Sequence, residues 1–128
     1  MNDWQTEEEN FLSLIAKLVC EFVEDKVDKV YLYCYKENEA ISHTFFYEKN
    51  RKIYSREEII SILGFPYDEK WNALIGVIRE CFKYWNELLY IWNHNVLNNC
   101  MEIKCIYTLE TKSIEIFRSF DMIEDENY

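Results

Sequence analysis

The stretch KVYLYCY, residues 29–35, alternates aliphatic side chains with tyrosines. The aliphatic set is Val30, Leu32 and Cys34, and the aromatic set is Tyr31, Tyr33 and Tyr35. Residues two positions apart lie on the same face of a strand. The stretch therefore predicts a strand with one aliphatic face and one tyrosine face.

Four more strands are predicted around this one. A turn at 37–39 leads to a second strand, in which Ile41, His43, Phe45 and Tyr47 share a face, and residues 51–54 make a short third strand. These three strands form an antiparallel meander. Near the other end of the chain, alternation from Met101 to Leu109 predicts a fourth strand. The turn at 110–112 then leads to a fifth, which contains Ile114, Ile116 and Phe117.

An amphipathic helix is predicted before the first strand. Thr6 and Glu9 have the spacing of a capping box, and apolar residues then recur at helical intervals from Phe11 to Phe22. The predicted helix spans residues 7 to about 24. Its first turn, Glu7 to Glu9, carries three acids that favour the helix dipole.

Two further helices are predicted between the third and fourth strands. Ser55 and Glu58 form a second capping box, which opens a short helix that Gly64 closes. A long helix follows, with Asp68 as a candidate cap, and its roughly 27 residues would reach about 40 Å. Its apolar stripe consists of Trp71, Leu74, Ile75, Ile78, Cys81, Phe82, Trp85, Leu88, Leu89 and Trp92. Helical spacing favours core packing over a ligand-stacking platform for its tryptophans.

The order of these elements predicts an α+β fold. We expect an antiparallel sheet of about five strands, with an N-terminal helix, a short helix and one long helix packed on it. A chain of 128 residues that is 49% hydrophobic is long enough for one core and too short for two ordinary domains. The prediction is a single domain over residues 1–128, with an acidic tail at 121–128.

The net charge of −10 resides entirely in the two ends of the chain. Residues 1–25 hold seven acids against Lys17 alone, residues 119–128 hold four acids and no base, and the stretch between them is balanced. An acidic surface attracts cationic proteins and repels nucleic acid. The alternative is that the charged ends serve only solubility.

The sequence offers little material for catalysis or for cofactors. Two glycines and one proline leave no nucleotide-binding loop, and the two histidines, His43 and His94, lie in no catalytic motif. Cys100 and Cys105 are the nearest pair of cysteines, and their odd spacing sends the two thiols to opposite faces of a strand. We therefore expect no enzyme activity, no cofactor and no metal.

Cysteine usage and the start of the chain predict a cytoplasmic protein. The five cysteines are an odd number scattered over apolar segments, which is typical of reduced, buried thiols. The acidic start is unlike a secretory signal, and no stretch is long enough to span a bilayer. No membrane partner is expected.

Three groups of residues are candidates for binding a protein partner. The first lies near the end of the N-terminal helix, where the dipole does not favour acids, and comprises Glu21, Glu24 and Asp25. The second lies off the main stripe of the long helix and comprises Tyr84, Glu87 and Tyr90, with Ile91 beside them. The equal alternative for this second group is packing against neighbouring elements of the fold. The third is the tail, with Asp121, Glu124, Asp125 and Glu126.

From Asp28 to Tyr33, directly after an amphipathic helix, the chain resembles the YezG-like family of bacterial immunity proteins. The resemblance continues in order over about residues 10–120. It includes Phe45-Phe46-Tyr47, Ile53-Tyr54, the long tryptophan-bearing helix and the hairpin from Met101 to Phe117. It implies an acidic cytosolic antitoxin that binds and neutralises the C-terminal domain of a cognate polymorphic toxin, typically a nuclease.

The resemblance leaves the toxin and its delivery system open. Leu97 to Cys100 replaces a Pro-Trp-Thr segment of that family, and the acidic C-terminal extension is only eight residues long here. Immunity proteins of contact-dependent inhibition systems meet the same physical requirements. The alternative from another class is a non-catalytic adaptor that binds a protein or peptide on its tyrosine-rich sheet face.

Overall fold

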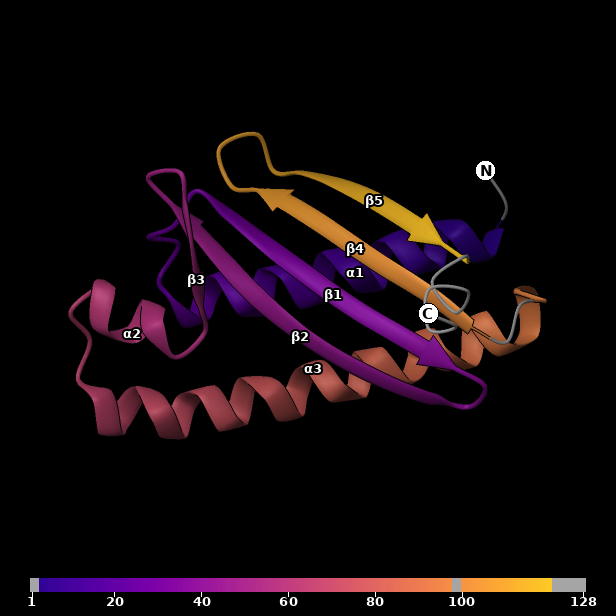
Figure 1. Ribbon diagram of the computed structural model, residues 1–128, viewed down its shortest axis with the longest axis horizontal. Helices are drawn as coiled ribbons and strands as arrows, with labels where there is room; N and C mark the ends of the chain where they lie inside the picture. Colours follow the sequence, from indigo (N-terminus) through magenta and orange to yellow (C-terminus); the bar gives the residue numbers. More distant parts are fainter. Residues whose placement is uncertain (1–2, 98–99, 121–128) are drawn as a thin grey trace, which may run out of the picture.

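The computed structural model describes residues 3–97 and 100–120 and has the predicted α+β fold (Figure 1). Five antiparallel strands form one sheet in the order β3-β2-β1-β4-β5. The strands are β1 (Lys29–Glu37), β2 (Ala40–Lys49), β3 (Lys52–Ser55), β4 (Cys100–Thr108) and β5 (Ser113–Ser119). The helices are α1 (Asp3–Phe22), α2 (Glu58–Ile62) and α3 (Tyr67–Asn95). Among the described residues, none of the helices is both long and apolar enough to cross a lipid bilayer.

The predicted two-faced strand is β1, at the centre of the sheet. Val30 pairs with Tyr47 and Tyr107, and Leu32 pairs with Phe45 and Cys105, and all six side chains are buried. The tyrosines of β1 alternate with this set and are half-buried. The register therefore continues the aliphatic face of β1 across its two neighbours.

Helices α1 and α3 lie on the same side of the sheet, against its aliphatic face (Figure 1). The core between them contains Leu12, Ile15 and Val19 of α1 and Trp85 of α3. The hydroxyl of buried Tyr47 donates a hydrogen bond of 2.8 Å to the backbone oxygen of Val19, which satisfies this polar atom within the core. The opposite face carries the tyrosines of β1.

The predicted start of the first helix is wrong. Helix α1 begins at Asp3, so Thr6 lies inside it and does not cap it. Trp4, Glu8 and Phe11 follow one another at intervals of four and three residues, which extends the inward-facing stripe back by one turn. Packing of this turn against the rest of the protein overrides the local capping signal.

The hydrogen bonds of the predicted capping box before α2 form, although α2 itself begins only at Glu58, and the predicted cap of α3 does not form. The Ser55 amide donates to the Glu58 carboxylate, and the Glu58 amide donates to the Ser55 hydroxyl, as a capping box requires. Gly64 closes α2 with a φ of 74°. Asp68 does not cap α3, because the helix begins at Tyr67 and Asp68 already lies in its first turn.

The predicted apolar stripe of α3 is only partly buried. Trp85 and Trp92 are buried in the core, as expected. By contrast, Trp71, Ile75 and Phe82 are 39%, 43% and 49% exposed. Helix α3 runs along one margin of the molecule, so its N-terminal half presents part of the stripe to solvent (Figure 1).

The turn after α1 holds a glutamate where glycine is usual. The amide of Asp25 donates to the Cys20 oxygen and that of Glu24 donates to the Glu21 oxygen, which is the Schellman pattern, and Glu24 has a φ of 55°. We expect Glu24→Gly to raise the free energy of unfolding by about 0.5–1 kcal/mol in urea denaturation, because glycine adopts this conformation without a Cβ clash. Glu24→Ala removes the same carboxylate and keeps Cβ, so it should not raise the free energy of unfolding. An equal increase in Glu24→Ala would mean that loss of the charge, and not the backbone conformation, causes the effect.

Candidate functional site

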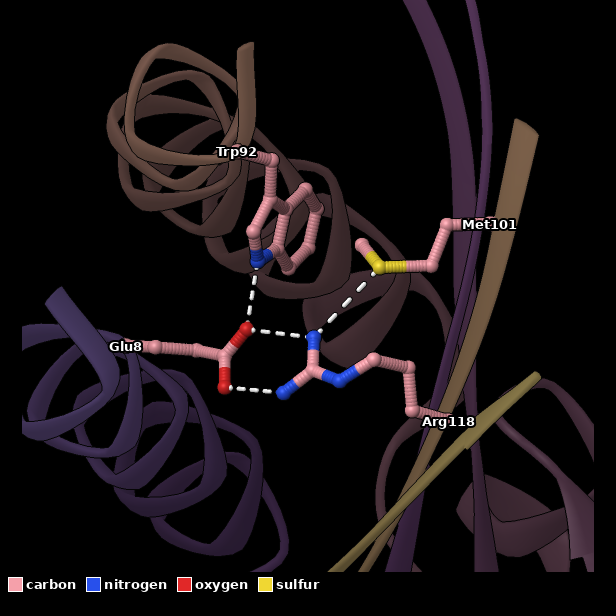
Figure 2. Close-up of polar contacts among 4 residues, drawn as sticks. All are labelled: Glu8, Trp92, Met101 and Arg118. Carbon is pink, nitrogen blue, oxygen red and sulfur yellow. Dashed lines mark hydrogen bonds and ion pairs between the residues drawn. The ribbon is translucent and has the colours of Figure 1, made fainter. Parts of the chain in front are cut away.

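A buried ion pair joins the two ends of the described chain (Figure 2). Glu8 of α1 is 1% exposed and accepts two hydrogen bonds from the Arg118 guanidinium of β5, at 2.6 Å and 2.8 Å. The indole N–H of Trp92 on α3 donates to the same carboxylate. Arg118 also reaches the Met101 sulfur at 3.4 Å and lies over the Trp4 ring. This cluster fixes the start of α1 against the end of α3.

A groove of about 450 Å³ lies where these two helix ends meet. We call it the αα groove. It is lined by Asp3, Trp4, Glu7 and Phe11 of α1, and by Glu87, Tyr90, Ile91, His94 and Asn95 of α3. The groove thus combines three carboxylates with aromatic rings from both helices.

The charge of the αα groove is one-sided. Its lining includes three acidic residues and no lysine or arginine, and Asp3, Glu7 and Glu87 make no ion pair with any described residue. The nearby Arg118 is already paired with Glu8. A cationic side chain entering this groove would meet carboxylates and ring faces together, an arrangement that favours arginine and lysine.

The second acidic surface is a groove of about 510 Å³ beside the β4–β5 hairpin. We call it the hairpin groove. It is lined by Lys17, Cys20, Glu21, Asp25, Tyr107, Leu109, Glu110 and Lys112. Its three carboxylates are offset by two lysines. It is therefore a weaker site for a cation than the αα groove.

The structure places four of the six described partner-binding candidates in these two grooves. Glu87 and Tyr90 line the αα groove, and Tyr84 packs its ring 6.1 Å from that of Phe11 at the same helix contact. Ile91, expected beside them off the main stripe, is 7% exposed, so at this position the alternative of packing within the protein holds.

Glu21 and Asp25 lie in the hairpin groove, whereas Glu24 does not line it. Glu24 lies within 3.5 Å of Lys26 and 4.0 Å of Lys70. The four predicted tail residues lie outside the described part of the chain; they are Asp121, Glu124, Asp125 and Glu126.

The sequence reasoning missed the α1 half of the αα groove. Glu7 was assigned to the helix dipole, and Asp3 and Trp4 were placed before the helix. The available signal was the spacing of Trp4, Glu8 and Phe11, which continues one helical face. The position of that face beside Glu87 depends on a helix pairing that no local pattern encodes.

His43, one of two candidates for proton chemistry, lies among rings. Its ring stacks 5.4 Å from that of Trp85 and lies 5.8 Å from that of Phe82. Burial, and secondarily the positive charge of Arg56, lowers the pKa of His43 from its ordinary value of 6.5. These surroundings suit a packed, neutral histidine.

This lowered pKa makes stability depend on pH. Below about pH 6.5 the unfolded chain takes up a proton that the folded chain does not, so the stability present above that pH is lost as the pH falls. We expect the free energy of unfolding to decrease between pH 7 and 5.5, by at most about 1.4 kcal/mol per pH unit for one group. His43→Phe should flatten this profile. A slope that survives in His43→Phe would assign the pH dependence to other groups.

The cysteines and other candidate ligands assemble no site in the described chain. All five cysteines are free and buried. Burial raises the pKa of Cys34 and Cys81 to about 12, which keeps both thiols protonated and unreactive. Within residues 3–97 and 100–120, no three His, Cys, Asp or Glu side chains lie close enough together to hold a metal ion.

The tyrosine face of the sheet is the surface that the adaptor alternative requires. The Tyr31 hydroxyl donates to Glu48 at 2.7 Å, and the Tyr33 hydroxyl donates to Glu102 at 2.6 Å. The hydrogen bond to Glu48 is the main cause that raises the pKa of Tyr31 to about 12. Glu102 also lines a groove together with Lys104, so this face offers a cation less unbalanced negative charge than the αα groove does.

Comparison with known proteins adds no relative. No protein-family model matches the chain, and no curated protein is significantly similar to it.

Proposed function

We propose that this protein is an immunity protein, an antitoxin that binds the C-terminal domain of a cognate polymorphic or contact-dependent toxin. The observation that carries the proposal is the αα groove, in which three carboxylates and several rings meet with no lysine or arginine in the lining. Interface centres are rich in aromatic residues, and a cation held between rings and carboxylates is a strong contact. The groove thus fits a basic protein partner.

The partner we propose is a basic nuclease domain. A nuclease holds phosphates in a cationic cleft, so an acidic protein can present carboxylates where phosphates bind, or can lie beside the cleft and exclude the substrate. The net charge of −10 speeds encounter with such a domain. Neutralisation then proceeds by binding alone, without catalysis, cofactor or metal, and without direct contact to nucleic acid or membrane.

Co-expression tests this proposal. The chain is expressed with the C-terminal domain of a large protein encoded directly upstream of it, in the cytoplasm, and cell survival and co-purification are both measured. Rescue of growth together with a stable complex supports the proposal. Toxicity without rescue or complex argues against it.

The competing proposal is an adaptor that binds a protein or peptide on its tyrosine face. The half-buried rings of Tyr31, Tyr33 and Tyr35, which none of the described helices covers, favour it. Salt separates the two functions. Binding through the αα groove to a basic domain weakens steeply between low and high ionic strength, whereas binding through the uncharged tyrosine rings depends little on salt.

A further inference from the structure

Helix α3 carries an exposed apolar surface that the proposed function does not use. It consists of Tyr67, Trp71, Ile75 and Phe82, which are 50%, 39%, 43% and 49% exposed, and we call it the α3 flank. The rings of Tyr67 and Trp71 stack at 6.0 Å, so this end of the flank is already ordered.

The α3 flank faces away from α1. Successive residues of a helix are about 100° apart, so Phe82 and Tyr84 point to nearly opposite sides of α3. Tyr84 packs on Phe11 of α1, whereas Phe82 contacts His43 at the other side. The flank therefore lies along the outer margin of the molecule, on the N-terminal half of α3, while the αα groove involves its C-terminal half (Figure 1).

Two residues of opposite charge lie beside the flank, on the same face of α3. Asp68 and Arg79 are eleven residues apart, which is close to three turns or about 16 Å. Neither makes an ion pair with a described residue. The acid lies at one end of the flank and the base at the other. Two antiparallel copies of this surface would therefore bring the acid of each copy to the base of the other.

We propose that the α3 flank binds a second copy of this chain, with the two α3 helices antiparallel about a two-fold axis. An axis near residue 73 brings Trp71 of each copy beside Ile75 of the other. The same axis brings Asp68 of each copy to Arg79 of the other, and Tyr67 to that same guanidinium. Apolar and charged contacts thus select one axis, as an isologous interface requires.

The area of the flank fits a weak, reversible dimer. With the axis near residue 73, Phe82 lies beyond the start of the partner's α3, so the contact consists of Tyr67, Trp71 and Ile75. Half-exposed side chains of this size leave roughly 300 Å² of surface on each copy, less than half of what one partner contributes to a standard interface. We therefore expect a dissociation constant on the order of 10 µM. The net charge opposes association, so moderate salt, which limits long-range repulsion to about 8 Å, favours the dimer.

Sedimentation of the full chain at about 1–500 µM tests the proposal without any toxin. The wild-type chain should pass from monomer to dimer over this range. Asp68→Arg alone and Arg79→Asp alone each place like charges together at both ends of the interface and should weaken association at least tenfold. The double variant restores opposite charges and should recover to within about threefold of wild type.

Glu69→Arg is the matched control for Asp68→Arg. Both acids lie in the first turn of α3, so both substitutions remove the same helix-dipole interaction, but Glu69 points away from the flank. Unchanged circular dichroism of every variant shows that it is folded. A wild-type chain that is monomeric throughout, or a double variant no better than the singles, would overturn the proposal and leave the function of the αα groove untouched.

Discussion

Glu8→Ala is expected to lower the free energy of unfolding by about 3–5 kcal/mol, the cost of breaking a buried ion pair on one side. The substitution leaves the Arg118 guanidinium without its carboxylate and removes the acceptor of the Trp92 indole N–H. Arg118 is 20% exposed, so water can solvate part of its charge, and the lower end of this range is the expected value. Urea denaturation measures the effect.

Two controls separate the ion pair from simpler causes. Glu7→Ala removes an exposed acid from the same turn of α1 and should change stability by no more than about 0.5 kcal/mol. Replacing both partners, as in Glu8→Leu with Arg118→Met, should cost far less than Glu8→Ala, because no unpaired charge remains. A loss below about 1 kcal/mol for Glu8→Ala would show that water enters the cluster and replaces the carboxylate.

The fold could be predicted from the sequence because apolar residues recur at the strand period or the helix period within each strand and helix. The alternation at Val30 to Tyr35 determines the two faces of β1, and the capping box of Ser55 with Glu58 marks the start of α2. Such signals are local, since they depend on residues two to four positions apart. Element ends were less predictable, because tertiary packing decided where α1 begins.

The site could be predicted only in part, because its contacts join residues far apart in the chain. From the sequence, Glu8 is interpreted as an acid in the first turn of the N-terminal helix that stabilises the helix dipole. In the structure its partner is Arg118, which is 110 residues away in the chain. Glu7 and Glu87 reach one groove only because α1 and α3 pack together. The candidates on α3 were found from helical geometry alone, whereas their counterparts on α1 required the helix pairing.

Reversing the charge of the αα groove is expected to abolish protection by an immunity protein of the proposed kind. In the variant Asp3→Lys, Glu7→Lys, Glu87→Lys, three cations replace three carboxylates in the contact itself. Like charges facing a basic domain at close range cost several kcal/mol, so affinity should fall by at least about a thousandfold. Most of the loss should lie in the dissociation rate, which reports contacts made in the complex.

The hairpin groove supplies a control with the same change in net charge. The variant Glu21→Lys, Asp25→Lys, Glu110→Lys also replaces three acids by three bases, but in a groove that already contains Lys17 and Lys112. If the αα groove makes the contact and the remaining acids only steer the partner, this variant should slow association by about tenfold and leave dissociation nearly unchanged. Surface plasmon resonance at two salt concentrations measures both rates for both variants.

The pattern of the two variants decides what the charge does. Loss of protection only with the αα groove variant locates the contact at the start of α1 and the end of α3, where the Glu8 cluster holds the two helices together. Loss only with the hairpin groove variant moves the contact to Glu21 and Asp25, beside Lys17 and Lys112. If both variants slow association equally and leave dissociation unchanged, the charge serves only the encounter with the partner. The binding surface would then be an uncharged one, such as the tyrosine rings of β1.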